Sequence, residues 1–174
     1  MMLVATTAFA TPFDLASKDW EGCAELVEIA RAEFGRGRVI PTAKINMREL
    51  KREDGLILMH PEKSVDAEAL SKFMRAGGRV VLLDDFGTGE ALLRHFNMER
   101  IPLPTRPVEA LRGNASFAIA EPASSHPVVL DVQRVVTNHA TGLKHPDLSP
   151  VLKVRGVGEP DVAVAVAGAV GQGR

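Results

Sequence analysis

The sequence contains no tyrosine, one tryptophan and one cysteine. A single thiol, Cys23, excludes an intrachain disulfide and a cysteine-rich zinc site, and the shortage of aromatic rings argues against an aromatic sugar-binding platform. An excess of one charge is lacking too, because a net charge of −1 predicts no general attraction to nucleic acid or anionic lipid. No apolar run is long enough for a transmembrane helix.

The N-terminal segment 1–10 (MMLVATTAFA) is apolar and uncharged. Ala8-Phe9-Ala10 has the small-x-small form of a signal-peptidase site, although the basic region that begins a signal peptide is missing. We interpret this segment as a signal-peptide remnant, which predicts an exported or periplasmic protein with a single domain over residues 11–174. The alternative is that residues 1–10 form the first β-strand of a cytoplasmic protein.

Strands alternate with helices in the central part of the chain. Residues 55–59 (GLILM) and 79–84 (RVVLLD) are apolar runs typical of strands covered on both faces. Residues 64–76 between them have a helical pattern, and a glycine-bearing loop at 85–89 leads to a second helix at 90–96. This alternation predicts a parallel sheet, whose ligands lie where strands are followed by helices.

Further elements are predicted on both sides of this central part. A helix at 19–34 has an apolar face that includes Cys23, so we expect this thiol to be an inert core residue. Short β-prone runs predict strands at 38–41, 115–120, 128–130, 134–137, 151–154 and 161–170, with a loop at 138–146. The last of these runs suits a central strand, and only a turn follows it. Because an apolar strand with a free edge favours aggregation, we interpret the chain as a fragment truncated at its C-terminus.

The run from 54 to 96, with its "FMRAGGRVVLLDDFGTG", resembles the class I glutamine-amidotransferase-like superfamily. It is most similar to an uncharacterised bacterial branch, a domain of unknown function related to gliding-type ABC-transporter accessory domains. The later stretch "HPVVLDVQRVVTNHATGL" resembles the same branch, and the resemblance covers roughly residues 20–174. It implies a three-layer α/β sandwich with a largely parallel central sheet, amidotransferase-like or flavodoxin-like, and antiparallel additions toward the C-terminus. It also implies export or a membrane tether in regions outside this sequence.

The catalytic pattern of that superfamily is interrupted in this chain. Its amidotransferases place a cysteine on a strand-to-helix turn of the form G-x-C-x-G, whereas the matching residues here are Leu83-Asp84-Asp85-Phe86-Gly87. Asp85 stands in the place of the nucleophile, and a carboxylate cannot replace a thiolate in glutamine hydrolysis. The downstream His-x-Glu pair has no match either, so we expect no glutaminase activity.

The loop after the second strand carries the first candidate binding residues. Asp84 and Asp85 either bind a metal ion or a polar ligand, or hold backbone N–H groups of the loop. Gly87, Thr88 and Gly89 either present N–H groups to a phosphate, or only satisfy the geometry of the loop, with Thr88 capping the next helix.

Histidines and an asparagine from other segments complete the candidate set. His60 follows the strand at 55–59, and Asn138 and His139 follow a later β-prone run. In a parallel arrangement these side chains converge over the Asp85 loop, where histidine and aspartate suit a divalent metal. The alternative is that His60 only ends its strand and that the other two are loop residues.

We therefore expect a non-catalytic binding or scaffolding module of a bacterial envelope-associated system. It would engage a protein partner or a small ligand, with no cofactor, no metal ion and no nucleic acid. The alternative function is a hydrolase in which Asp85 is the nucleophile or a metal ligand and a histidine is the base. The distance from Asp85 to a histidine separates the two hypotheses, because beyond about 8 Å direct acid–base cooperation is excluded even with one bridging water.

Overall fold

The computed structural model describes residues 12–19 and 21–173. These residues form two compact units, one that ends at Asn46 and one that begins at Met47. Segment 1–10, which we interpret as a signal-peptide remnant, lies outside the described residues. None of the helices in the described part of the chain is both long and apolar enough to cross a membrane.

The first unit contains helix α1 (Ala24–Phe34) and a short 3₁₀ helix, η1 (Arg36–Arg38). The predicted helix at 19–34 is confirmed only from Ala24 onward, because before it the Gly22 N–H donates to the Asp19 carbonyl at 2.8 Å and the Cys23 N–H to the Asp14 carbonyl at 2.9 Å, instead of forming helical bonds. The strand predicted at 38–41 is wrong, since Arg38 belongs to η1 and no strand follows it among the described residues of this unit. Burial of Cys23 is confirmed, with an exposed fraction of 7%.

The second unit begins with a parallel pair of strands, β1 (Gly55–Met59) and β2 (Arg79–Leu83). Helix α2 (Ala67–Arg75) connects them, and helix α3 (Glu90–His95) follows β2. This strand–helix–strand–helix order confirms the prediction for the central part of the chain. Asp66 begins α2, because its side chain accepts the Ala69 N–H at 2.9 Å.

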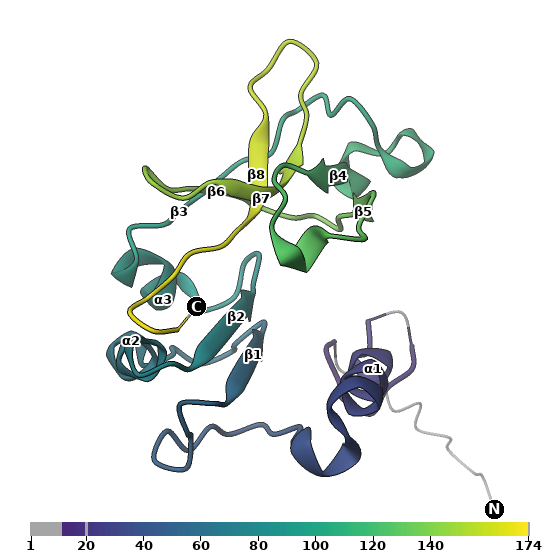
Figure 1. The fold of residues 1–174 in the computed structure, drawn as a ribbon. Coiled ribbons are helices and arrows are strands. Elements are labelled where there is room, and N and C mark those ends of the chain that lie inside the picture. Colours follow the sequence, from purple (N-terminus) through teal and green to yellow (C-terminus); the bar gives the residue numbers. More distant parts are fainter. Residues whose placement is uncertain (1–11, 20, 174) are drawn as a thin grey trace, which may run out of the picture. The chain divides into compact units, whose positions relative to one another are not determined.

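A core of large side chains holds this α/β part together. Leu58 of β1, Leu70 of α2 and Leu92 of α3 are its buried centre. Figure 1 shows both helices beside the same face of the two-stranded sheet. The opposite face is not covered to the same degree, since Ile57 and Val81 are 52% and 48% exposed. The prediction of strands covered on both faces is therefore wrong.

The rest of the second unit is a six-stranded antiparallel sheet with the strand order β3-β6-β8-β7-β4-β5. Its strands are β3 (Glu99–Ile101), β4 (Ile119–Pro122), β5 (Val135–Val136), β6 (Gly142–Lys144), β7 (Pro150–Val154) and β8 (Val162–Val166). The interior position of β8 confirms the prediction of a central strand there. Buried small residues, Ala118, Ala120 and Val154, form the core of this sheet.

The predicted fold class, a three-layer sandwich with a largely parallel central sheet, is wrong. Parallel pairing is limited to β1 and β2, whereas the strands from β3 onward pair in antiparallel fashion. A parallel pair needs a crossover of a dozen or more residues, usually a helix. After α3 the described residues contain only three-residue 3₁₀ helices, η2 (Leu111–Gly113), η3 (Ala115–Phe117) and η4 (Pro127–Val129). Without a connecting helix these strands pair in antiparallel fashion, both as consecutive strands such as β7 and β8 and as strands distant in the chain such as β3 and β6.

Three of the predictions of local structure in this region also need correction. Residues 115–117 are helical, so the strand predicted at 115–120 begins only at Ile119. Residues 128–130 lie in and after η4 instead of a strand, because Pro127 at the start of that turn favours helical backbone angles. The predicted loop at 138–146 contains β6.

The turn near the C-terminus lies against the end of α2. Val170 pairs with Gly173, and the Gln172 N–H donates to the Arg75 carbonyl at 3.4 Å. A Cβ on Gly173 would lie 2.1 Å from the Gly78 carbonyl oxygen, so only glycine permits this close approach. The interpretation of the chain as a fragment of a longer protein stays a prediction.

Candidate functional site

The loop that follows β2 is built around the buried carboxylate of Asp84. One carboxylate oxygen, Oδ1, accepts the Gly87 N–H at 2.7 Å. The other, Oδ2, accepts the Gly89 N–H at 2.8 Å and pairs with Arg100 Nη2 at 2.6 Å. The Asp84 side chain is fully buried, with an exposed fraction of 0%. Asp84 therefore follows the structural alternative, in which an aspartate holds backbone N–H groups of its loop.

Two glycines are required because the backbone passes so close to this carboxylate. A Cβ at Gly87 would lie 2.3 Å from Asp84 Oδ1, and one at Gly89 would lie 2.4 Å from Oδ2. Both distances are far shorter than a van der Waals contact. The need for close approach explains both glycines, without a phosphate.

Arg100 of β3 supplies the counter-charge to Asp84 from the antiparallel sheet. Its side chain is 18% exposed, and Nη1 lies 3.4 Å from Glu90 Oε2 and 3.5 Å from the Gly87 carbonyl oxygen. A buried carboxylate requires such a partner, because an unpaired charge in the interior is costly. The Asp84–Arg100 ion pair thus joins the loop after β2 to the first strand of the other sheet.

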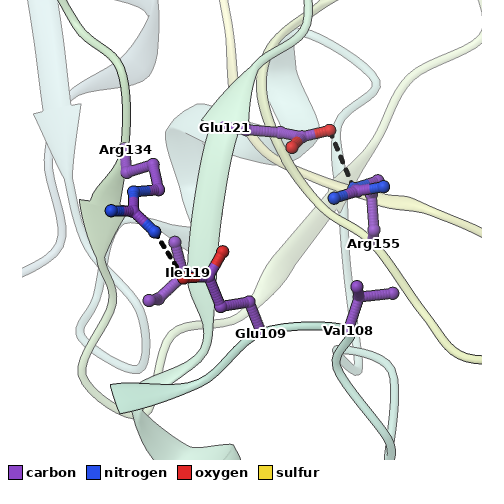
Figure 2. Close-up of a pocket in the computed structure, with 6 residues that line it drawn as sticks. All are labelled: Val108, Glu109, Ile119, Glu121, Arg134 and Arg155. Carbon is purple, nitrogen blue, oxygen red and sulfur yellow. Dashed lines mark hydrogen bonds and ion pairs between the residues drawn. The ribbon is translucent and has the colours of Figure 1, made fainter.

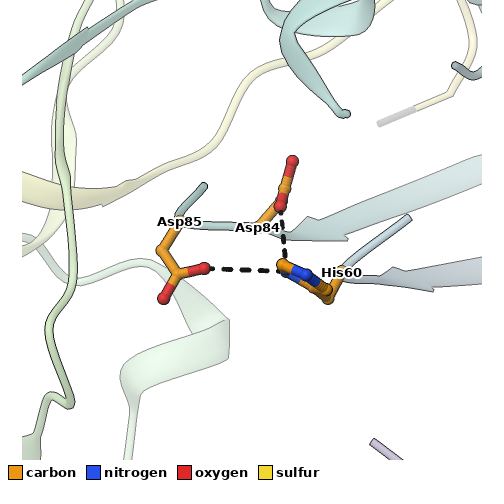
Figure 3. A group of neighbouring side chains, drawn as sticks. All are labelled: His60, Asp84 and Asp85. Atoms are coloured by element: carbon orange, nitrogen blue, oxygen red, sulfur yellow. Dashed lines mark ion pairs between the residues drawn. The ribbon is translucent and has the colours of Figure 1, made fainter. Parts of the chain in front are cut away.

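His60 lies at the end of the neighbouring strand and faces both aspartates (Figure 3). Its backbone N–H donates to the Leu83 carbonyl at 2.8 Å, which extends the parallel pairing beyond β1. The ring nitrogen Nδ1 lies 3.5 Å from Asp84 Oδ1 and 3.8 Å from Asp85 Oδ1. The ring also makes an edge contact with Phe86, with centroids 4.9 Å apart. His60 is 22% exposed and Asp85 26%.

The His60 segment is tied to the glycine loop by Thr88. Both the backbone N–H and the hydroxyl of Thr88 donate to the Pro61 carbonyl, at 2.9 and 2.6 Å. The predicted role of Thr88 as the cap of α3 is therefore wrong, because its hydroxyl makes this longer-range bond, and α3 begins without a side-chain cap. We name the surface formed by His60 and residues 84–89 the strand-end surface.

Asn138 and His139 do not join this surface through any polar or ring contact. His139 donates its backbone N–H to the Ser116 carbonyl at 2.8 Å, and its ring contacts Phe117 with centroids 6.0 Å apart. The segment does reach the loop after β2 two residues later, where the Thr141 hydroxyl donates to the Asp85 carbonyl at 3.2 Å. Antiparallel pairing at β5 and β6 directs the two predicted residues elsewhere and brings Thr141 close instead.

The geometry permits two kinds of chemistry at the strand-end surface. Donor atoms of His60, Asp84 and Asp85 all lie within 4.8 Å of one another, close enough to surround one metal ion. The separation of His60 and Asp85 is also well inside the limit set above for direct acid–base cooperation. Asp84 is less suited to act as a base or nucleophile, because both of its oxygens already accept hydrogen bonds.

A second depression, on the antiparallel sheet, is a poor candidate for a site. Figure 2 shows that it is lined by two ion pairs, Arg134 with Glu109 and Arg155 with Glu121. Because each charge already has a partner, an incoming ion would have to break a pair to bind. We therefore assign no role to this depression.

The thiol of Cys23 has no features of a nucleophile. Burial, and to a smaller extent the Asp14 carboxylate, raises the pKa of this thiol above its ordinary value. A raised pKa keeps the thiol protonated near neutral pH, and only the thiolate is a strong nucleophile.

Comparison with models of protein families identifies the family of this chain. The model of a domain of unknown function, DUF4350, matches residues 16–174. The chain belongs to the DUF4350 family. No curated protein and no solved structure matches it. The match does not connect this DUF4350 domain with the glutamine-amidotransferase-like superfamily.

Arg100 and Thr141 contact the strand-end surface of the DUF4350 domain, and sequence reasoning missed both. A buried aspartate predicts a basic partner, but the sequence has 21 lysines and arginines, and none is marked by its neighbours as that partner. Only the position of β3 beside the loop selects Arg100.

Proposed function

We propose that this DUF4350 domain is a non-catalytic binding module, and that its strand-end surface binds a protein partner or a small ligand. The observation that carries the proposal is the complete engagement of the Asp84 carboxylate by Gly87, Gly89 and Arg100. These bonds hold the loop in one conformation before any ligand arrives. A preformed loop loses little conformational entropy on binding, which favours recognition.

The exposed groups of this loop combine an aromatic ring with charge. Phe86 is 70% exposed although it follows the buried Asp84 carboxylate by only two residues. Beside it are the partly exposed His60 and Asp85. Binding surfaces are enriched in aromatic residues and fix their ligands through a few well-placed polar groups. The strand-end surface offers both.

Nuclear magnetic resonance on the isotope-labelled full chain tests the proposal, with a library of soluble fragments of both charges as the probe. We expect shift changes to concentrate at His60, Asp85 and Phe86, and to weaken in Asp85→Asn and Phe86→Ala. Phe34→Ala is the matched control, because Phe34 is 60% exposed but belongs to α1. Fragments that bind equally well to the Phe86→Ala variant, or only elsewhere, would contradict the proposal.

A hydrolase is the second candidate function, favoured by the 3.8 Å between His60 Nδ1 and Asp85 Oδ1. In such an enzyme Asp85 would attack the substrate, and His60 would activate the water that releases the product. The substrates to measure are p-nitrophenyl phosphate, p-nitrophenyl acetate and glutamine. The binding proposal expects no turnover of any of them. Turnover that disappears in Asp85→Asn and His60→Ala, but persists in His95→Ala, would replace the binding proposal by the hydrolase.

We further propose that the module works in the bacterial envelope, because Ala8-Phe9-Ala10 has the form of a signal-peptidase site. The resemblance of residues 54–96 to the uncharacterised bacterial branch named above, whose members are commonly exported or membrane-tethered, supports the same setting. N-terminal sequencing of the protein from its native cells is expected to find Thr11 as the first residue. A native protein that retains residues 1–10 would contradict the envelope assignment and leave the binding proposal untouched.

A further inference from the structure

We infer that the strand-end surface binds a first-row divalent cation, such as Zn²⁺ or Mn²⁺, through His60 Nδ1, Asp84 Oδ1 and Asp85 Oδ1. The inference rests on the proposed binding function and names a ligand for it. The ring nitrogen lies 3.5 Å from the Asp84 oxygen and 3.8 Å from the Asp85 oxygen, and all three donors are within 4.8 Å of one another.

These separations are close to those found around a bound metal. Bonds of about 2.0–2.1 Å from a tetrahedral ion place neighbouring donor atoms about 3.3 Å apart. To reach this spacing, His60 Nδ1 and Asp84 Oδ1 must approach each other by only a few tenths of an ångström. Asp85 Oδ1 must move further, because it lies 3.8 Å from His60 Nδ1. Rotation of the Asp85 side chain supplies the larger movement, since this side chain is partly exposed and its Oδ1 accepts the backbone N–H of the next residue, Phe86.

The backbone positions of the three donors are fixed by the parallel strand pair. His60 comes directly after β1, and Asp84 and Asp85 come directly after β2. The bond from the His60 N–H to the Leu83 carbonyl keeps the two strand ends in register. The bond from Thr141 to the Asp85 carbonyl holds the outer residue from the other side. Donors carried by rigid elements bind a metal without a large ordering cost.

Neighbouring groups orient the Asp84 carboxylate in the way that metal sites require. Its Oδ2 is held by Arg100 and the Gly89 N–H, whereas its Oδ1 accepts one hydrogen bond, from the Gly87 N–H, and lies 3.5 Å from His60 Nδ1, so that a second lone pair of Oδ1 is left for a cation. Carboxylates that bind metals are usually held by such outer hydrogen bonds, and removal of these bonds weakens metal binding about 10–100-fold. The guanidinium charge is balanced in turn by Glu90 at 3.4 Å, so the two aspartates keep net negative charge for the cation.

The donor set indicates the class of metal. One imidazole with two carboxylates suits Zn²⁺, Mn²⁺ or Fe²⁺ better than the all-oxygen shell that Mg²⁺ and Ca²⁺ prefer. Three protein donors leave coordination positions for water or for a group of a bound partner. The His60 ring contacts the exposed Phe86 ring, so a ligand of the metal would lie near this aromatic group as well.

The competing explanation is that a protonated His60 simply bridges the two aspartates, which produces the same distances without a metal. Calorimetric titration of the chelator-treated full chain with ZnCl₂, MnCl₂ and MgCl₂ separates the two. We expect one Zn²⁺ or Mn²⁺ per chain, with binding at least about tenfold weaker in His60→Ala and in Asp85→Asn, and about tenfold weaker in Arg100→Lys. Mg²⁺ is expected to bind least.

Matched controls are His95→Ala and Asp131→Asn, which remove an exposed histidine and an exposed aspartate outside the strand-end surface. Both are expected to bind metal as the parent does, and the visible absorption of bound Co²⁺, which reports the coordination geometry, is expected to match the parent in both and to change in His60→Ala. A parent chain that binds none of these ions, or binds them equally well in His60→Ala, would overturn the inference. If fragments still bind at Phe86 when no metal binds, the metal inference is wrong but the proposed binding function is supported.

Discussion

The two sheets of the second unit bury their apolar surface with different kinds of side chains. The parallel pair β1–β2 places large residues such as Leu58 against Leu70 and Leu92 of the two helices. The antiparallel sheet has a core of Ala118, Ala120 and Val154, where strands and loops approach closely. Large side chains at helical and strand spacing are visible in a sequence, whereas small residues become a core only when strands pair. The comparison explains why the pairing of the first part was predicted, whereas for the second part only separate strands and antiparallel additions toward the C-terminus were predicted, without a six-stranded sheet.

Loss of the Asp84–Arg100 ion pair is expected to lower the free energy of unfolding most, because this pair joins the loop after β2 to the antiparallel sheet. In Asp84→Ala the Arg100 guanidinium stays buried without its carboxylate, and such a loss typically costs about 3–5 kcal/mol. Glu121→Gln is the control, since its pair with Arg155 is exposed at 36% and 48% and should contribute at most about 1 kcal/mol. Urea unfolding of both variants measures the difference. If Asp84→Ala and Glu121→Gln lower the free energy of unfolding equally, the Asp84–Arg100 pair does not stabilise the contact between the two sheets.

Core truncations test whether the two parts unfold together. Leu58→Ala is expected to lower the free energy of unfolding by about 2–5 kcal/mol, and Val154→Ala by about 2 kcal/mol, since fewer buried methyl groups are removed. If the second unit unfolds as one cooperative body, amide hydrogen exchange will accelerate in both sheets in either variant. Acceleration confined to the mutated sheet would show two independent bodies.

A methyl group at Gly89 is expected to disturb the loop that supports the strand-end surface. Its Cβ would overlap Asp84 Oδ2, and overpacking of this kind costs about 1–3 kcal/mol. Gly55→Ala is the matched control in β1, because no atom lies within 4 Å of its added Cβ and its backbone angle is ordinary. Thermal unfolding of the two variants should differ clearly. A Gly89→Ala protein as stable as the parent would contradict the described loop geometry.

The smallest effect concerns a carboxylate beside the antiparallel sheet. Hydrogen bonds from the Thr105 hydroxyl and N–H, and from the Arg106 N–H, hold the pKa of Glu159 below its usual value. A lowered folded-state pKa means that this stabilisation is present above the unfolded-state pKa and is lost as the pH falls through the folded-state pKa. Glu159→Gln should therefore lower the melting temperature near neutral pH. The same variant should also show a smaller fall in melting temperature when the pH drops below about pH 4. Thermal unfolding at several pH values measures how the melting temperature changes with pH. The same pH dependence in parent and variant would argue against these hydrogen bonds.

Local pattern predicted the strand-end surface in part. The apolar runs at 55–59 and 79–84 predict strands, and the parallel pairing of these strands places His60 and Asp84 side by side. The same reasoning failed for Asn138 and His139, because their direction depends on antiparallel pairing at β5 that no local signal reveals. It also failed for residues 128–130, which are β-prone but follow a proline that begins a 3₁₀ turn.

By itself the sequence determined the β1–α2–β2 segment, the glycine loop and the burial of Cys23, since each follows from residue spacing within a short stretch. Tertiary structure decided the partners of these elements. Arg100 reaches Asp84 across 16 residues, and Thr141 reaches Asp85 across 56. Hydrophobic periodicity specifies which face of an element is buried, but it carries no information about which distant strand will pair with it. That choice depends on how the whole chain packs, and it alone brings Arg100 and Thr141 to the loop.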